Sequence, residues 1–264
     1  MNGYGKRQGM RVLLPLLTVV TVIVVWHFAV KLGEIPPFLV PSPDSVLEAG
    51  IKFAPAFWAA TKVTLLETVL GFSLAIVIGL GIAMVFAWAL PVKDSVYPLI
   101  LITQAMPKIA VAPLFIVWLG PTALSAKVLL VFLISFFPIV VNAVRGLESA
   151  EPELIDLMRS MGASRWMIFR KLQLPGAVPY IFSGLKVGVT MAVTGALVGE
   201  LIGGNQGLGY LMNVASGNID TALMFADIVV LTFMAMVLFY IVEGVDRLCT
   251  RWQDRGTTVV NGTM

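Results

Sequence analysis

Residues 148–175 read ESAEPELIDLMRSMGASRWMIFRKLQLP, a polar, arginine-rich stretch between two long apolar runs. The rest of the 264-residue chain is largely apolar. Overall, 58% of the residues are hydrophobic and 12% are charged, and the mean hydropathy is +0.93. A soluble domain carries about 25% charged residues. The sequence therefore predicts an integral membrane protein in which 148–175 is a segment that lies in water.

The apolar runs predict membrane-spanning α-helices. Each run approaches or exceeds the roughly 20 residues that cross a bilayer as a helix. None alternates apolar and polar residues as a β-barrel strand does. We expect an all-α membrane protein with six transmembrane helices. The predicted spans lie near residues 12–30, 65–90, 96–119, 125–144, 177–202 and 224–246.

Basic residues predict the orientation of these spans, because Lys and Arg concentrate on the cytoplasmic side of a membrane. Twelve of the 18 Lys and Arg residues precede the first span or follow spans two, four and six. Both termini and the 148–175 segment are therefore predicted to be cytoplasmic. The net charge of +3 reflects these flanks and does not indicate a nucleic-acid-binding surface. The opposite side holds at most Lys31, Lys52, Lys62 and Lys127.

Within 148–175 the sequence predicts two short helices. The first covers 153–159, Gly162 ends it, and Ser164 caps a second helix that runs to about Leu172. Several Met, Trp and Phe side chains then face water. Such a hairpin fits either a partner protein that buries these side chains or anionic lipid headgroups that face its basic residues. Composition leaves both interpretations open.

The spacing within this segment resembles the EAA motif of ABC importer permeases. That motif reads Glu-Ala-Ala, three residues, Gly, nine residues, Ile, one residue, Leu-Pro. Its positions in this chain are Asp156, Leu157, Met158, Gly162, Leu172, Leu174 and Pro175. The acid is thus one methylene shorter than in the motif, and larger residues replace both alanines.

Four further stretches are similar to the nitrate, sulfonate and taurine branch of binding-protein-dependent permeases. They are TLLETVLGF (64–72), AMPKIAVAPLFIVWLG (105–120), SMGASRWMIFRKLQLPGAVPYIFSGLKVG (160–188) and LVGELIGGNQGLGYLM (197–212). The resemblance implies the type I ABC importer permease architecture. It places the transmembrane domain at 59–248, after an N-terminal tail, first helix and periplasmic loop in 1–58. A cytoplasmic tail follows at 249–264.

The resemblance also implies the partners of the chain. We expect a homodimer in a bacterial inner membrane, with two ATP-binding subunits on its cytoplasmic face and a periplasmic or lipid-anchored substrate-binding protein outside. ATP and Mg²⁺ would bind to the ATPase subunits, so the chain itself is expected to hold no cofactor or metal and not to be an enzyme. The residues expected to contact the ATPase are Asp156, Ser160, Met161, Gly162, Ala163, Ser164, Arg165, Met167 and Pro175.

The solute is left open by the resemblance, between a nitrate-, sulfonate- or taurine-like anion and a pyrimidine-like or aromatic-acid-like compound. A second function also fits the sequence: a self-sufficient secondary transporter driven by an ion gradient through Glu200 and Lys108. A signalling or scaffold protein is disfavoured, because the predicted spans contain charged residues and a kink near Pro107.

Ionisable residues inside the spans are candidates for the translocation path, since charges in a bilayer are costly and usually functional. They are Glu67, Lys108, Lys186 and Glu200. Lys108 either faces the pore or bonds a backbone carbonyl freed by the kink. Glu67 is expected to be wetted near the far-side interface, and Lys186 to have a structural role.

Small residues recur every four positions from Gly184 to Ala196, and Glu200 is the next residue in this spacing. They predict a packing seam, and Ala75, Gly79 and Ala83 predict a second one. Such seams suit close helix packing, including packing between two copies of the chain. The glycine-rich stretch 203–209 lacks a preceding strand and a Lys-Ser/Thr pair, so it is not a nucleotide-binding loop. We expect it to be a flexible turn.

Overall fold

The computed structural model describes residues 3–120 and 122–250, with side chains at residue 14 and from residue 16 onward. The basic side chains predicted to precede the first span, and the predicted tail beyond residue 250, lie outside this description. The described residues form helices and connecting turns without a strand, which confirms the all-α class.

The chain divides into two compact units. The first unit comprises residues 1–59 and 211–230. Its elements are α1 (Gly3–Leu32), α2 (Pro43–Lys52), the start of α3 (Ala54–Trp88), most of α10 (Leu208–Gly217) and the start of α11 (Thr221–Cys249). Within it, the Trp26 and Phe225 rings lie 5.7 Å apart, and Thr221 donates a 2.7 Å hydrogen bond to the Pro37 carbonyl.

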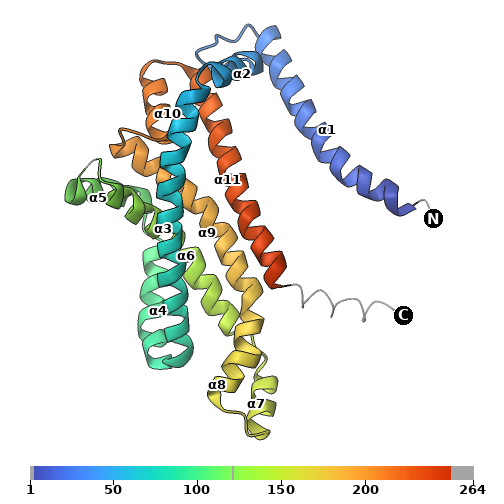
Figure 1. The fold of residues 1–264 in the computed structure, drawn as a ribbon, viewed down its shortest axis with the longest axis vertical. Coiled ribbons are helices and arrows are strands. Elements are labelled where there is room, and N and C mark those ends of the chain that lie inside the picture. The colour runs from blue at the N-terminus through green and yellow to red at the C-terminus, as the bar shows by residue number, and fades with distance from the viewer. Residues whose placement is uncertain (1–2, 121, 251–264) are drawn as a thin grey trace. The chain divides into compact units, whose positions relative to one another are not determined.

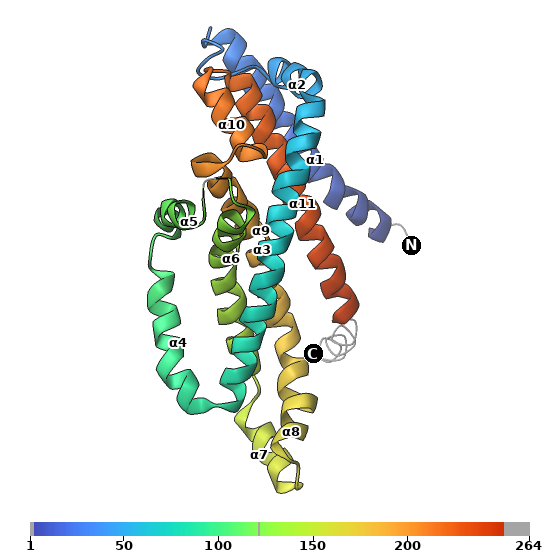
Figure 2. The ribbon, with the colours of Figure 1, turned by 60° about the vertical axis from the view of Figure 1, so that its left-hand side comes forward.

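The second unit comprises residues 60–210 and 231–264. Besides the remainder of α3 and α11, its helices are α4 (Leu90–Gln104), α5 (Ala112–Leu119), α6 (Leu124–Leu147), α7 (Pro152–Ser160), α8 (Arg165–Ile168) and α9 (Leu174–Gly203). A 3-10 turn, Lys108–Val111, precedes α5, and a π-helical turn, Phe169–Gln173, joins α8 to α9. Helices α6 and α9 lie side by side in both views (Figures 1 and 2).

Four helical segments are long and apolar enough to cross a membrane: Ala54–Trp88, Leu124–Leu147, Arg165–Gly203 and Thr221–Cys249. A fifth candidate is the pair Leu90–Gln104 and Lys108–Leu119, which is bent by 90°. This break confirms the predicted kink and makes it a full interruption of span three. The shorter apolar helix Leu16–Leu32 contains most of the first predicted span.

The two predicted small-residue seams both pack against α6 of the same chain. A Cβ added at Gly184 would lie 2.8 Å from the Asn142 Cβ, and one added at Gly79 would lie 3.1 Å from the Ile139 Cγ2. Larger residues at either glycine would push the helices apart. The seams therefore hold α3 and α9 on α6 within one chain, so they are not left open for a second copy.

Candidate functional site

The 148–175 segment forms the predicted helical hairpin, α7 and α8, beside the start of α9 (Figure 2). Gly162 turns the chain between the two helices with φ +78, a backbone conformation that favours glycine. The Ser164 hydroxyl accepts a 3.3 Å hydrogen bond from the Met167 amide and caps α8. The first predicted helix, the glycine turn and the serine cap are confirmed. The predicted end of the second helix near Leu172 is wrong, because the helix continues through a π-helical turn, Phe169–Gln173, into α9.

Large apolar side chains are exposed on this hairpin. Met161 at the turn is 78% exposed, Trp166 56% and Leu157 55%. Leu157 takes a place where the motif has alanine, so the larger side chain extends from the surface. Exposed apolar groups gathered on a water-facing element mark a surface for a partner or a membrane.

Three aromatic rings join the hairpin to the end of α3. The Trp166 ring stacks on Phe169 at 5.7 Å and on Trp88 at 5.8 Å, and Trp88 lies 5.5 Å from Phe169. Each such ring pair contributes about 0.5–1.5 kcal/mol beyond the apolar area that it buries. The hairpin is therefore attached to α3 by side chains as well as to α9 by the backbone.

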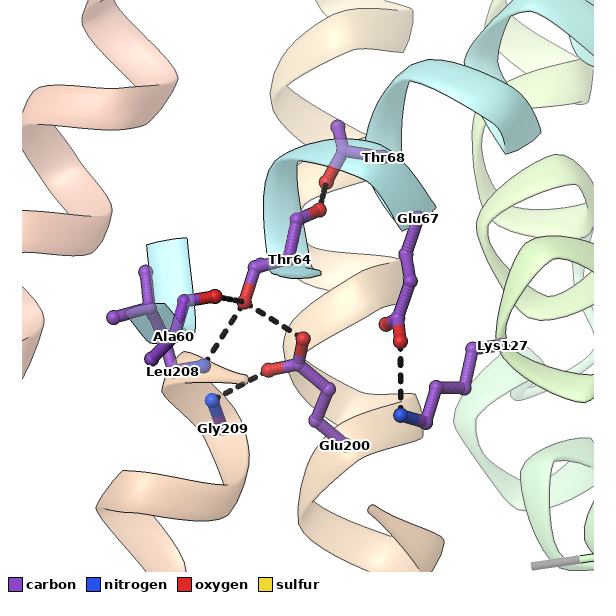
Figure 3. A network of polar contacts seen from close by, with 8 residues as sticks. All are labelled: Ala60, Thr64, Glu67, Thr68, Lys127, Glu200, Leu208 and Gly209. Atoms are coloured by element: carbon purple, nitrogen blue, oxygen red, sulfur yellow. Dashed lines mark hydrogen bonds and ion pairs between the residues drawn. The ribbon is translucent and has the colours of Figure 1, made fainter. Parts of the chain in front are cut away.

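A cluster of buried polar side chains lies near the other end of α9. In it, an ion pair joins α3 to α6. The Lys127 Nζ donates to the Glu67 Oε1 at 2.8 Å, and the two side chains are 4% and 1% exposed (Figure 3). The expectation that Glu67 is wetted is wrong, because Lys127 neutralises it inside the helix bundle. Lys127, predicted to lie on the far side of the membrane, is buried in this pair.

Glu200 lies in the same cluster and is completely buried. Its carboxylate accepts hydrogen bonds from the Thr64 hydroxyl at 2.7 Å and from the Gly209 amide at 2.6 Å (Figure 3). Thr64 in turn accepts a 2.9 Å bond from the Leu208 amide. One carboxylate and one hydroxyl thus bind the first amides of α10, which have no partner within that helix.

Glycines in the 203–209 stretch let the backbone wrap around this carboxylate. Gly207 has φ +102, and a Cβ at this position would collide with the Glu200 carboxylate. A Cβ at Gly209 would lie 2.8 Å from the Glu200 Cβ, and one at Gly204 would lie 2.5 Å from the Glu200 carbonyl oxygen. The predicted turn between two helices is confirmed, since α9 ends at Gly203 and α10 begins at Leu208, and its glycines also permit close packing.

The two candidate lysines have partners elsewhere. Lys108 donates to the Gln104 carbonyl at 3.3 Å, across the break in span three, and lies 4.6 Å from the centre of the Phe137 ring. Lys186 binds Asp246 at 2.6 Å and also pairs with Glu243 on α11. Of the four candidates for the path, the structure brings only Glu67 and Glu200 together.

The model of a family described as the binding-protein-dependent transport system inner membrane component matches residues 75–254. The chain belongs to this family. It is therefore a permease of an ABC importer, and this assignment replaces the secondary-transporter alternative.

Two relatives extend the similarity along most of the permease. The riboflavin transport system permease protein RibX of Chloroflexus aurantiacus is 37% identical over 90% of this chain and 89% of its own length. The formylaminopyrimidine transport permease protein ThiX of Halalkalibacterium halodurans is 32% identical over 94% of this chain and 99% of its own length.

A solved structure agrees with the fold of the permease. A chain of the inward-facing MetNI methionine ABC transporter superposes with a TM-score of 0.61. The match covers 75% of this chain and 96% of that chain at 21% sequence identity. The likeness confirms the type I importer architecture.

The sequence reasoning missed three residues that complete the two clusters: Lys127, Thr64 and Trp88. Lys127 is the fourth residue of α6 and lies inside the predicted span 125–144, so a charge within a span was the signal that could have found it. The sequences that flank Thr64 and Trp88 are ordinary for a membrane-spanning helix. No local pattern distinguishes them, because their partners lie far away in the sequence.

Proposed function

We propose that the α7–α8 hairpin docks on a separate ATP-binding subunit and transmits its movement to the permease. The observation that carries the proposal is the exposed apolar tip at Met161, attached through Trp166 and Trp88 to α3. A hairpin that only covered lipid headgroups would need no ring cluster connecting it to a spanning helix. The tip supplies the apolar anchor that docking interfaces use.

The surface beside the tip also fits a protein partner. A hollow lined by Ile155, Arg159 and Arg165 lies next to Trp88 and Phe169. Two guanidinium groups around an apolar floor suit an acidic or aromatic side chain of a partner, since Arg pairs with carboxylates and stacks on rings. Of the residues predicted to contact the ATPase, Arg165 lines this hollow.

The assembly that we propose contains two copies of the permease and two ATPase subunits, which bind ATP and Mg²⁺. The hairpin and both termini face the cytoplasm, in accordance with the distribution of basic residues. A substrate-binding protein delivers the solute on the opposite face. Closure of the ATPases moves the hairpins, and the spanning helices open the path to one side or the other.

For the solute we propose a small nitrogen-containing heteroaromatic compound. The support comes from the two relatives, whose names specify riboflavin and a formylaminopyrimidine. Binding of riboflavin, aminopyrimidines, sulfonates and nitrate to the cognate binding protein tests this choice by calorimetry. Binding of sulfonate or nitrate alone would contradict it.

The docking proposal is tested by replacing the apolar tip with a charge. We expect Met161→Glu to reduce the ATPase that co-purifies with the permease at least tenfold, because the carboxylate would be desolvated in the interface. A tenfold loss corresponds to about 1.4 kcal/mol. The matched control is Ile51→Glu on α2, where the replaced side chain is 69% exposed. Equal co-purification of the ATPase with both variants would contradict docking at this hairpin.

A further inference from the structure

A polar hollow of about 560 Å³ lies beside the buried ion pair of the second unit. Its size falls within the range of about 300–1,000 Å³ that is typical of sites for small organic ligands. Its polar lining consists of Lys62, Glu67, Thr122, Lys127, Asn205 and Gln206.

The floor of the hollow is the Glu67–Lys127 pair. Burying two opposite charges costs several kcal/mol per ion, and their mutual attraction only offsets that cost. Ionised side chains in membrane-spanning helices almost always face the bundle interior or a water-filled cavity, where they mark a substrate or ion pathway. The Glu67 Oε2 is buried and has no hydrogen-bond partner among the described residues.

The rim of the hollow is built where two helical runs are interrupted. Thr122 lies between α5 and α6, and Asn205 and Gln206 lie between α9 and α10. All three side chains are exposed. At membrane depth, non-helical backbone is tolerated where it is covered by protein or lines a water-filled cavity. Two such interruptions meet at this hollow, next to the buried ion pair.

The rim is also held in place. Asn205 and Gln206 are at the tip of the turn whose following amides bind Glu200 and Thr64. Gly207, immediately after this tip, packs against the Glu200 carboxylate. A site whose polar groups are fixed before a ligand arrives loses less entropy on binding. Glu200 is therefore a positioning residue for the rim.

We propose that this hollow is a solute-contact site of the permease, which fits a small organic solute carrying both hydrogen-bond donors and acceptors. The inference rests on the proposed import of a heteroaromatic solute and adds the place where the permease touches it. Two amides, a hydroxyl and charges of both signs match the mixed donors and acceptors of such a molecule. An inorganic anion would match only the lysines.

Cysteine protection in the complete transporter tests the contact. The permease carries Cys249→Ser, which removes its one cysteine, and either Gln206→Cys or the control Asn218→Cys, at an exposed position after α10. It is reconstituted with its ATPase and binding protein in liposomes. Labelling by a methanethiosulfonate reagent is followed with riboflavin, cytosine or methanesulfonate present, and uptake of each probe is measured in the same vesicles.

We expect an imported heteroaromatic probe to slow labelling of Gln206→Cys at least threefold and to leave Asn218→Cys unchanged. Gln206→Ala should raise the KM for uptake severalfold, with unchanged ATP consumption per solute. If ATP-driven uptake occurs but the probe does not slow labelling of Gln206→Cys and Gln206→Ala does not change the KM, the contact site is overturned. The proposed function then remains intact. Protection by methanesulfonate alone would overturn the solute class. Loss of the ATPase requirement would instead refute the proposed function.

Discussion

The buried pair between Lys127 and Glu67 gives the sharpest prediction for stability. Lys127→Met keeps the length of the side chain and removes its charge. The Nζ and Oε1 atoms are 2.8 Å apart, so their attraction is about 6 kcal/mol at an effective dielectric constant of about 20. The desolvation of two ions offsets most of this attraction. The intact pair therefore adds little net stability.

Removal of one partner has a much larger effect, because it leaves the other charge buried and unpaired. With Glu67 1% exposed, we expect Lys127→Met to lower the free energy of unfolding by about 3–5 kcal/mol. Adding Glu67→Gln removes the orphaned charge. The double variant should therefore be more stable than Lys127→Met alone, by about 2 kcal/mol.

The assay is unfolding of the detergent-solubilised permease, followed by circular dichroism during a denaturant titration. Lys62→Met is the control, because this exposed lysine lies on α3, the helix of Glu67, and borders the same hollow as Lys127. Its effect should stay within about 0.5 kcal/mol. The reasoning fails if Lys127→Met is as mild as the control, or if the two changes at the pair simply add.

Two other substitutions test the two clusters separately. Gly207→Ala should destabilise the same preparation by more than 2 kcal/mol, from about 1–2 kcal/mol of backbone strain and the collision with the Glu200 carboxylate. Gly217→Ala, where a Cβ meets nothing within 4 Å, should be neutral. In reconstituted transporter, Trp88→Ala should retain the bound ATPase and lower the solute imported per ATP hydrolysed, since this ring connects the hairpin to α3. An unchanged ratio of uptake to hydrolysis would exclude that role.

The hairpin was predictable because its signals are local. A glycine with positive φ, a serine cap three residues before the amide that it binds, and a proline in the first turn of α9 all act within one or two turns of chain. Gly162 and Ser164 therefore indicated the end of α7 and the start of α8 correctly, whereas the helical run continues through Pro175. The break near Pro107 was predictable for the same reason, since proline removes a backbone donor.

The far cluster was not predictable from the sequence, because its partners are distant along the chain. Thr64 and Glu200 are separated by 136 positions, and Lys127 and Glu67 by 60. A single sequence shows that each charge needs a partner but does not show which one. The packing of the 203–209 glycines against Glu200 was not predictable for a related reason. Glycine occurs both where the backbone must be flexible and where another group packs closely against it. The sequence alone does not distinguish these two reasons, and only the neighbouring Glu200 carboxylate in the structure does.

One helix connects the two clusters. From Leu174 to Glu200, α9 runs for about 26 residues, or about 39 Å at 1.5 Å per residue. Pro179 lies inside its first two turns, where the missing amide permits bending. From Gly184 onward the small-residue seam is packed against α6, and close-packed interfaces transmit strain because they contain few voids. The close packing of α9 on α6 begins before this seam, because a Cβ at Gly146 of α6 would lie 3.0 Å from the Ala177 carbonyl oxygen, so Pro179 lies within the packed region. We therefore expect α9 and α6 to move as one unit over this length, so that a shift of the hairpin would reach the Glu200 cluster.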